Sequence, residues 1–145
     1  MVFLNKYLKE IGIDENYWLF ADKKIDKRAL PDEEGFVPAE FFNLDTSLAL
    51  YIYSHLCYFK EHISHIATPF LCDKNGNELE SDKSQKKWDK ILNIMIDGFK
   101  MLIANNGYIQ EYLGETDIFE INKKRDKIID KGLKTFIKYY HCLWY

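Results

Sequence analysis

Apolar residues recur at intervals of three and four along four segments of this chain, and this spacing predicts four α-helices. The first segment is short and ends at Gly12. Its apolar face comprises Phe3, Leu4, Tyr7, Leu8 and Ile11. The aromatic run 17–20, the charged run 22–28 and the residues Pro31, Gly35 and Pro38 then predict a short helix and an irregular strap over the core.

The second helix is expected to start between Asn43 and Asp45, either of which can cap its first turn. It should end near Ala67 because Pro69 follows. Its predicted core-facing row is Leu48, Ile52, Leu56, Phe59, Ile63 and Ile66. Further apolar and aromatic residues cover most of its circumference, which is typical of a central helix.

The third helix is expected from about Asp82 to Asn105, after a break in which Asn75-Gly76 predicts a tight turn. This turn is compatible with a small hairpin near residues 70–80. Its predicted core positions are Trp88, Ile91, Leu92, Met95, Phe99, Leu102 and Ile103. Its opposite face is polar and consists of Asp89, Asn93, Asp97 and Lys100. Gly98 within this helix predicts a close approach to another helix.

The fourth helix is expected from about Thr116 to Leu143, because Asn105-Asn106-Gly107 forms a helix stop and a short link through Gly114 follows. Its predicted inward residues are Ile118, Ile129, Leu133, Phe136, Ile137, Tyr140 and Leu143. The four segments predict one all-α domain over residues 1–145, a bundle of three long helices and a shorter N-terminal helix with mostly antiparallel neighbours.

Composition supports a single core without metal or disulfide. The 145 residues are 47% hydrophobic and 16% aromatic, and a domain of this length buries roughly 70% of its unfolded surface. The net charge of −3 is too small to indicate a polyanionic partner for the whole molecule. Three cysteines, Cys57, Cys72 and Cys142, form no metal-binding spacing and are expected to be reduced core residues.

The chain contains no stretch of about 18 uncharged apolar residues, so no membrane span is expected. Its first residues lack the features of a secretory signal peptide. We therefore expect the protein in the cytoplasm of the cell that makes it.

One row of side chains beside the core face of the second helix can form a binding site. It comprises Tyr51, His55, Tyr58, His62 and His65. Steps of four and three place these hydroxyl and imidazole groups on one side of a helix, where they can contact a partner or a ligand. The alternative is a half-buried helix edge, where Tyr and His are common because each has an apolar body and a polar tip.

A metal site is not expected. Glu61, His62 and His65 lie close in sequence, but a zinc site needs further ligands, and no HExxH motif occurs.

A second row, on the fourth helix, is basic and can bind anions. It comprises Lys124, Lys127, Lys131, Lys134 and Lys138. Such a ridge can contact phosphates, so direct nucleic-acid binding stays open. The alternative is a solvated helix face, because Glu120 precedes Lys124 by four residues and Asp130 precedes Lys134 by four, the spacing of helix-stabilising ion pairs.

No catalytic motif occurs: GxSxG, GxxxxGK[ST] and GxGxxG are all absent. The chain is therefore predicted not to be an enzyme, with no catalytic residues and no cofactor.

Three groups of residues resemble small uncharacterised proteins of bacteriophages and prophages. They are Phe42-Asn43-Leu44-Asp45 with Leu48-Ala49, Ile52, Leu56 and Phe59-Lys60-Glu61; Trp88 with Ile91-Leu92, Met95-Ile96 and Gly98-Phe99; and Gly132-Leu133 with Phe136, Tyr139-Tyr140 and Leu143-Trp144. One departure is Ser54-His55, where the related proteins have a Pro-Arg pair.

The resemblance implies a viral accessory protein in the host cytoplasm. By analogy with inhibitors of host defence, such as anti-CRISPR proteins, its partner would be a host protein, a protein–nucleic acid complex or a nucleotide signal. Two alternatives remain at this point: a structural protein that self-associates into homo-oligomers through exposed aromatics, and a small enzyme that uses the Tyr/His row.

Overall fold

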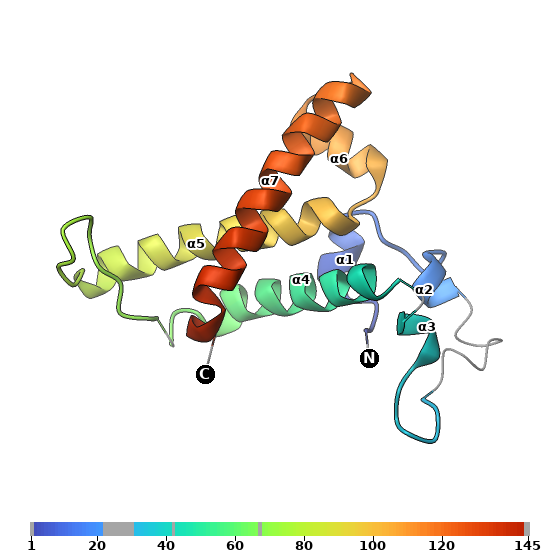
Figure 1. Cartoon of the computed structure of the whole chain (residues 1–145), viewed down its shortest axis with the longest axis horizontal. Helices are drawn as coiled ribbons and strands as arrows, with labels where there is room; N and C mark the ends of the chain where they lie inside the picture. The colour runs from blue at the N-terminus through green and yellow to red at the C-terminus, as the bar shows by residue number, and fades with distance from the viewer. Residues whose placement is uncertain (1, 22–30, 42, 67, 144–145) are drawn as a thin grey trace.

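The computed structural model describes residues 2–21, 31–41, 43–66 and 68–143, and these ranges confirm the predicted all-α class (Figure 1). The α-helices are α1 (Lys6–Glu10), α2 (Trp18–Ala21), α3 (Pro38–Phe41), α4 (Leu44–His62), α5 (Ser81–Ile103), α6 (Asn106–Leu113) and α7 (Ile118–Tyr139). A 3-10 turn at Tyr140–Cys142 follows α7.

The central helix is α5, which packs against both α4 and α7. Its residues Trp88, Leu92 and Met95 have no exposed surface. In Figure 1 α4 runs antiparallel to α5 and α7 crosses both at a steep angle. The prediction that the second helix of the sequence is central was wrong, because α4 is covered on one side only.

The crossing of α5 and α7 occurs at two glycines. A Cβ atom added to Gly98 would lie 2.6 Å from the Cα atom of Gly132. Both residues are buried, so the two helix backbones touch there. The predicted close approach at Gly98 is confirmed, and Gly132 is its partner.

Helix α4 begins where the sequence predicts, but it ends at His62, and residues 63–66 form turns. The side chain of Asn43 makes no capping hydrogen bond, and Asp45 lies inside the helix rather than before it. Its buried apolar residues are Ala49, Leu50, Tyr53 and Leu56. Leu48 and Ile66 of the predicted core row are exposed. Apolar residues surround this helix, so the periodicity did not define which side is buried.

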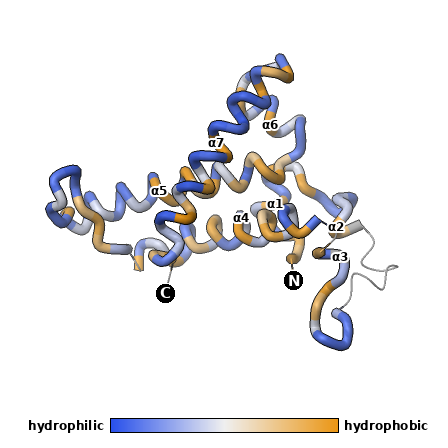
Figure 2. The backbone as a smooth tube through the Cα atoms, viewed as in Figure 1, coloured by the Kyte–Doolittle hydropathy of each residue, from blue (hydrophilic) through white to orange (hydrophobic). Residues whose placement is uncertain are grey.

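Helix α6 was not predicted. Asn105, expected only to stop the preceding helix, accepts a hydrogen bond from the backbone N–H of Tyr108 (2.8 Å) and so caps a new helix. Gly114 ends α6 with φ of +61°, a backbone conformation that favours glycine. Helices α6 and α7 form a hairpin that projects from the other helices, and the upper part of α7 is mainly hydrophilic (Figures 1 and 2).

The predicted inward row of the last helix is correct only in part. Ile129, Leu133, Phe136 and Leu143 pack against the core. Ile118, Ile137 and Tyr140 are exposed. Because α7 crosses α5 instead of lying along it, the start of α7 with Ile118 extends beyond the helices that would cover it. Ile137 and Tyr140 lie on the outward side of the C-terminal end, which is packed through its other residues.

At the N-terminus Asn5 caps α1 by accepting hydrogen bonds from the backbone N–H groups of Tyr7 (3.1 Å) and Leu8 (3.3 Å). Leu8 and Ile11 are buried as predicted, whereas Phe3 is exposed. The predicted hairpin is reduced to one antiparallel bridge between Cys72 and Glu78. The charged run 22–28 lies outside the described residues.

Candidate partner-binding surface on α4

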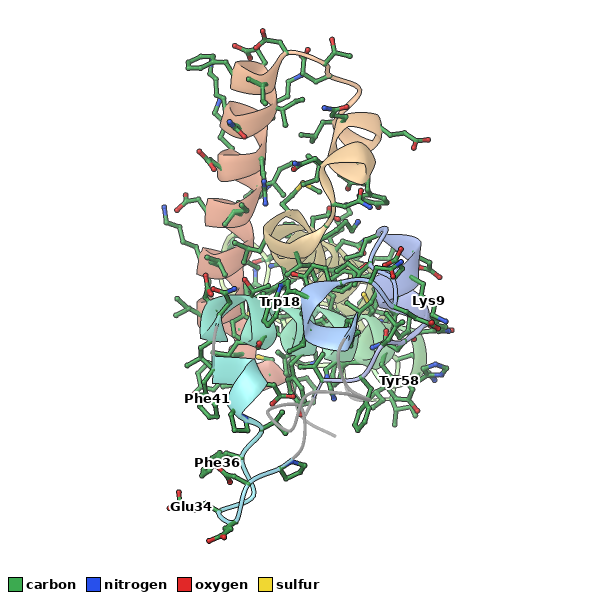
Figure 3. All side chains as sticks on the ribbon, turned by 90° about the vertical axis from the view of Figure 1, so that its right-hand side faces the viewer. Lys9, Trp18, Glu34, Phe36, Phe41 and Tyr58 are labelled. Carbon is green, nitrogen blue, oxygen red and sulfur yellow. The ribbon has the colours of Figure 1, made fainter. Side chains whose placement is uncertain are left out.

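The outward side of α4 carries a row of exposed side chains without any fixed charge. We call this row the α4 face; it comprises Leu44, Leu48, Tyr51, His55, Tyr58 and His62. The steps of four and three residues align the row along the helix, opposite the buried residues Leu50 and Tyr53. Leu48 is 50% exposed, Tyr51 44% and Tyr58 53%. Figure 3 shows Tyr58 at the edge of the molecule away from the projecting hairpin.

Two ring pairs hold the aromatic groups of this face against the helix. The rings of Tyr51 and His55 stack with centroids 3.8 Å apart, and those of Tyr58 and His62 lie 4.4 Å apart. The Nδ1–H of His55 donates to the backbone oxygen of Tyr51 (2.7 Å). Paired rings lose little conformational freedom when a partner covers them.

The Tyr51–His55 pair separates two small hollows. One, of about 270 Å³, is completed by Val2, Phe3, Asn5 and Ser54. The other, of about 220 Å³, is completed by Ile52, Leu56, Phe59, Phe136 and Leu143. Neither hollow is lined by a lysine, an arginine or an acidic residue. The surface therefore presents an aromatic ridge between two mostly apolar depressions.

The wall of the first hollow is fixed by hydrogen bonds. Asn5 Nδ2 donates to Ser54 Oγ (3.0 Å), and the Ser54 hydroxyl donates to the backbone oxygen of Leu50 (2.8 Å). Ser54 is buried. The segment before α1 is thus tied to α4 beside His55.

His65, predicted to belong to the row, is not part of it. Because α4 ends at His62, the helical spacing does not continue to residue 65. His65 instead lines a different hollow, between α1, α4 and α5. The helix end, which the sequence placed near Ala67, accounts for this difference.

The lysine row lies along the outward side of α7 and is partly neutralised. Lys124 pairs with Glu115 (3.0 Å) and Lys134 with Asp130 (2.7 Å). Glu120, the expected partner of Lys124, instead lies 3.8 Å from Lys123. Lys138 lies over the Tyr139 ring, 5.3 Å from its centroid. Among the described residues Lys127, Lys131 and Lys138 have no ion-pair partner, so three of the five positive charges of this row are not neutralised.

Glu61 forms contacts with Lys6 and Tyr7, and its carboxylate also lies 3.6 Å from His62 Nε2. Both of its carboxylate oxygens accept from Lys6 Nζ at 2.8 Å, and one also accepts from the Tyr7 hydroxyl at 2.5 Å. The hydrogen bond from Lys6 is the main reason why the pKa of Glu61 lies below its usual value. In the part of the chain that the structure describes, no group of His, Cys, Asp and Glu side chains is arranged to hold a metal ion.

Two of the three cysteines, Cys57 and Cys142, are partly buried. Burial raises the pKa of Cys57 to about 11 and also raises that of Cys142. These shifts disfavour the nucleophilic thiolate. Cys72, expected in the core, is exposed.

The structure also contains a larger hollow of about 810 Å³ between α1, α4 and α5, which the sequence analysis did not identify as a site. Its α5 wall is formed by Asp89, Asn93, Asp97 and Lys100. The sequence identifies these residues as the polar side of a helix, and their helical spacing was the only sign that they could share one surface. Their position opposite α4 depends on the helix packing.

The chain matches no protein-family model, and none of the curated proteins or solved structures is significantly similar to it. The resemblance to bacteriophage and prophage proteins therefore stays a prediction from the sequence. None of the helices within the described ranges combines the length and the apolar character that crossing a bilayer requires.

Proposed function

We propose that this chain is a non-enzymatic accessory protein that binds a host protein through the α4 face and blocks its activity. The observation that carries the proposal is the uncharged, exposed aromatic face with two hollows beside it. The centres of protein interfaces are depleted in charge and enriched in aromatic residues, and tyrosines frequently supply much of their binding energy.

The dimensions of the site favour a protein over a nucleotide. Pockets for small ligands usually measure about 300–1,000 Å³, whereas these hollows measure about 270 and 220 Å³. A nucleotide also needs cationic or N–H donors for its phosphates, and no lysine or arginine lines either hollow. The partner we propose therefore presents two neighbouring apolar side chains, one for each hollow.

The proposed host origin of the partner rests on the resemblance to phage and prophage proteins. Inhibition follows if the α4 face covers a functional surface of that partner. A bound accessory protein needs no catalytic group of its own for this effect.

Affinity capture from host lysate tests the proposal, with Tyr58→Lys as the disruptive variant. The substitution introduces a charge within the α4 face, and burying an unpaired charge in an interface is costly. We expect the wild-type chain to retain a host protein and Tyr58→Lys to retain at least about tenfold less, which corresponds to about 1.4 kcal/mol.

Phe119→Lys is the matched control, because Phe119 is also an exposed aromatic residue but lies at the start of α7, on another surface. This variant should retain the partner fully. The activity of the captured protein is then measured with and without the chain. Equal retention by Tyr58→Lys and the wild type, or an unchanged activity of the captured protein, contradicts the proposal.

A second candidate function is self-association through the same face. Because the face carries no Lys, Arg, Asp or Glu, two copies can pair on it without opposing like charges. Light scattering distinguishes the two functions. A mass that stays monomeric across concentrations supports binding of a host protein, and a dimer that Tyr58→Lys dissociates supports self-association.

A further inference from the structure

The hollow between α1, α4 and α5 is a polar groove on a different surface from the α4 face. Its walls are Tyr7 of α1, Cys57, Lys60 and Glu61 of α4, and the polar row of α5. Ile96 supplies an apolar part of its lining and is buried. The groove thus contains several charged groups around a partly apolar surface.

Most of these charges are already paired within the protein. Lys100 Nζ lies 2.9 Å from Asp97 Oδ1, and the Tyr112 hydroxyl donates to the same oxygen (3.1 Å). The ammonium group of Lys100 also lies 4.5 Å from the centre of the Tyr112 ring. Glu61 is neutralised by Lys6. These four groups need no ligand to satisfy their charges.

One ammonium group and one carboxylate remain. The ammonium group of Lys60 has no hydrogen bond or ion pair to any described residue, and the Lys60 side chain is half-buried. Asp89, also half-buried, accepts a hydrogen bond from Gln85 Nε2 (2.9 Å), and no cation among the described residues pairs with it. No ion pair joins Lys60 to Asp89, so neither group neutralises the other.

Their placement puts opposite charges on facing walls. Lys60 belongs to α4 and Asp89 to α5, and these helices run antiparallel (Figure 1). Asn93 lies one helical turn after Asp89 on the same wall, and its exposed amide has no hydrogen-bond partner among the described residues. The groove therefore offers a cation on one side and an anion with an amide on the other.

This arrangement selects for a ligand with two opposite charges. A ligand with a single charge leaves either Lys60 or Asp89 unmatched, whereas a zwitterion gives both a charge-assisted hydrogen bond. Methylene groups between the two charges of the ligand can lie against Ile96 and the half-buried side chain of Cys57.

We propose that this groove binds a small zwitterion of the amino-acid class, with its carboxylate on Lys60 and its ammonium group on Asp89, and that Asn93 hydrogen-bonds to the same ligand. This site is separate from the α4 face and does not depend on the proposed host partner.

Calorimetric titration of the full chain tests the proposal with glycine, 4-aminobutyrate and 6-aminohexanoate, which differ in the separation of their charges. Butyrate and butylamine are the probes with a single charge. We expect at least one zwitterion to bind with one molecule per chain, and the single-charge probes to bind at least about tenfold more weakly. The side-chain amide resonance of Asn93 should shift during the same titration.

Lys60→Met and Asp89→Asn keep the approximate size of the side chains and should each weaken binding at least about tenfold. Lys90→Met and Asp126→Asn remove exposed charges outside the groove and should leave binding unchanged. Tyr58→Lys should also bind the zwitterion normally, which separates this site from the α4 face.

The proposal is overturned if no zwitterion binds at concentrations up to about 10 mM, which would reveal even millimolar affinity. It is equally overturned if butyrate or butylamine binds as well as the zwitterions, or if Asp89→Asn binds like the wild type.

Discussion

At the contact between Gly98 and Gly132, two helix backbones meet with no side chain between them. The carbonyl oxygen of Ile94 also lies 3.0 Å from the position that a Cβ atom on Gly132 would take. Each neighbouring atom belongs to a backbone and cannot rotate away as a flexible side chain can. The orientation of α7 on α5 therefore depends on the absence of two methyl groups.

Gly98→Ala should destabilise the protein by about 2 kcal/mol, since overpacking costs typically 1–3 kcal/mol and exceeds the gain of about 1 kcal/mol in helix propensity. Urea unfolding measures the change. Gly107→Ala is the control, because a Cβ atom at this helical position meets only Asn105 Oδ1, at an ordinary 3.6 Å. The control should be neutral or stabilising. A Gly98→Ala protein as stable as the control would show that α5 and α7 can move apart at this contact and accommodate the added methyl group.

At the scale of the elements, Asn105 connects three of them. Its side chain oxygen caps α6, and its Nδ2 donates to the backbone oxygen of Gly12 (2.8 Å). It lies two residues after the end of α5, and Gly12 follows α1. One amide group thus orients α6 and holds the N-terminal segment beside the end of the central helix.

Asn105→Ala should lower the free energy of unfolding by about 1–2 kcal/mol, since loss of a helix N-cap alone costs about 1 kcal/mol. Asn105→Asp keeps the capping oxygen and loses the donor to Gly12, so it should recover most of the cap contribution. Asn106→Ala, an exposed change in the first turn of the same helix, serves as the control and should have little effect. Equal losses for the alanine and aspartate variants would assign the stability to the Gly12 contact instead of the cap.

At the scale of the whole molecule, one apolar cluster joins the helices. It includes Leu8 of α1, Leu50 of α4, Met95 of α5, Ile109 of α6 and Ile121 of α7. Trp88 belongs to the same cluster and is fully buried. Because the helices share this cluster, removal of one of them exposes the apolar surface of the others, and unfolding should be cooperative.

We expect a single unfolding transition in urea, as is usual for domains of this size. The double variant Trp18→Phe and Trp144→Phe leaves Trp88 as the only tryptophan, so its fluorescence reports on the core while circular dichroism reports on helix content. The two midpoints should coincide. A helical signal that persists after the Trp88 fluorescence has changed would instead identify a separately stable part, such as the α6–α7 hairpin.

Much of the fold could be predicted from the sequence, and the errors have a common cause. The limits of α5 and the close approach at Gly98 agree with the predictions, because they depend on local spacing and on a missing side chain. The buried side of α4 was misplaced, since apolar residues surround this helix. Helix α6 was missed because Asn105 both follows one helix and caps the next.

For the candidate site, too, the sequence predicted the local features and missed those that depend on distant segments. The sequence placed Tyr51, His55, Tyr58 and His62 on one line because the helical repeat is a local property. It could not show that this line faces solvent, nor that two hollows flank it, since Val2 and Phe136 come from distant segments. The groove with Lys60 and Asp89 could not be predicted from the sequence either, because it forms only where α4 and α5 pack side by side.

The amino-acid sequence by itself determined that the chain forms helices, and approximately where most of them lie, because helix formation depends on residues three or four positions apart. Only the tertiary structure decided which side of each helix is exposed and which charges find partners. Water is excluded, and opposite charges are paired, by neighbours that are remote in the chain, and no local pattern specifies their positions.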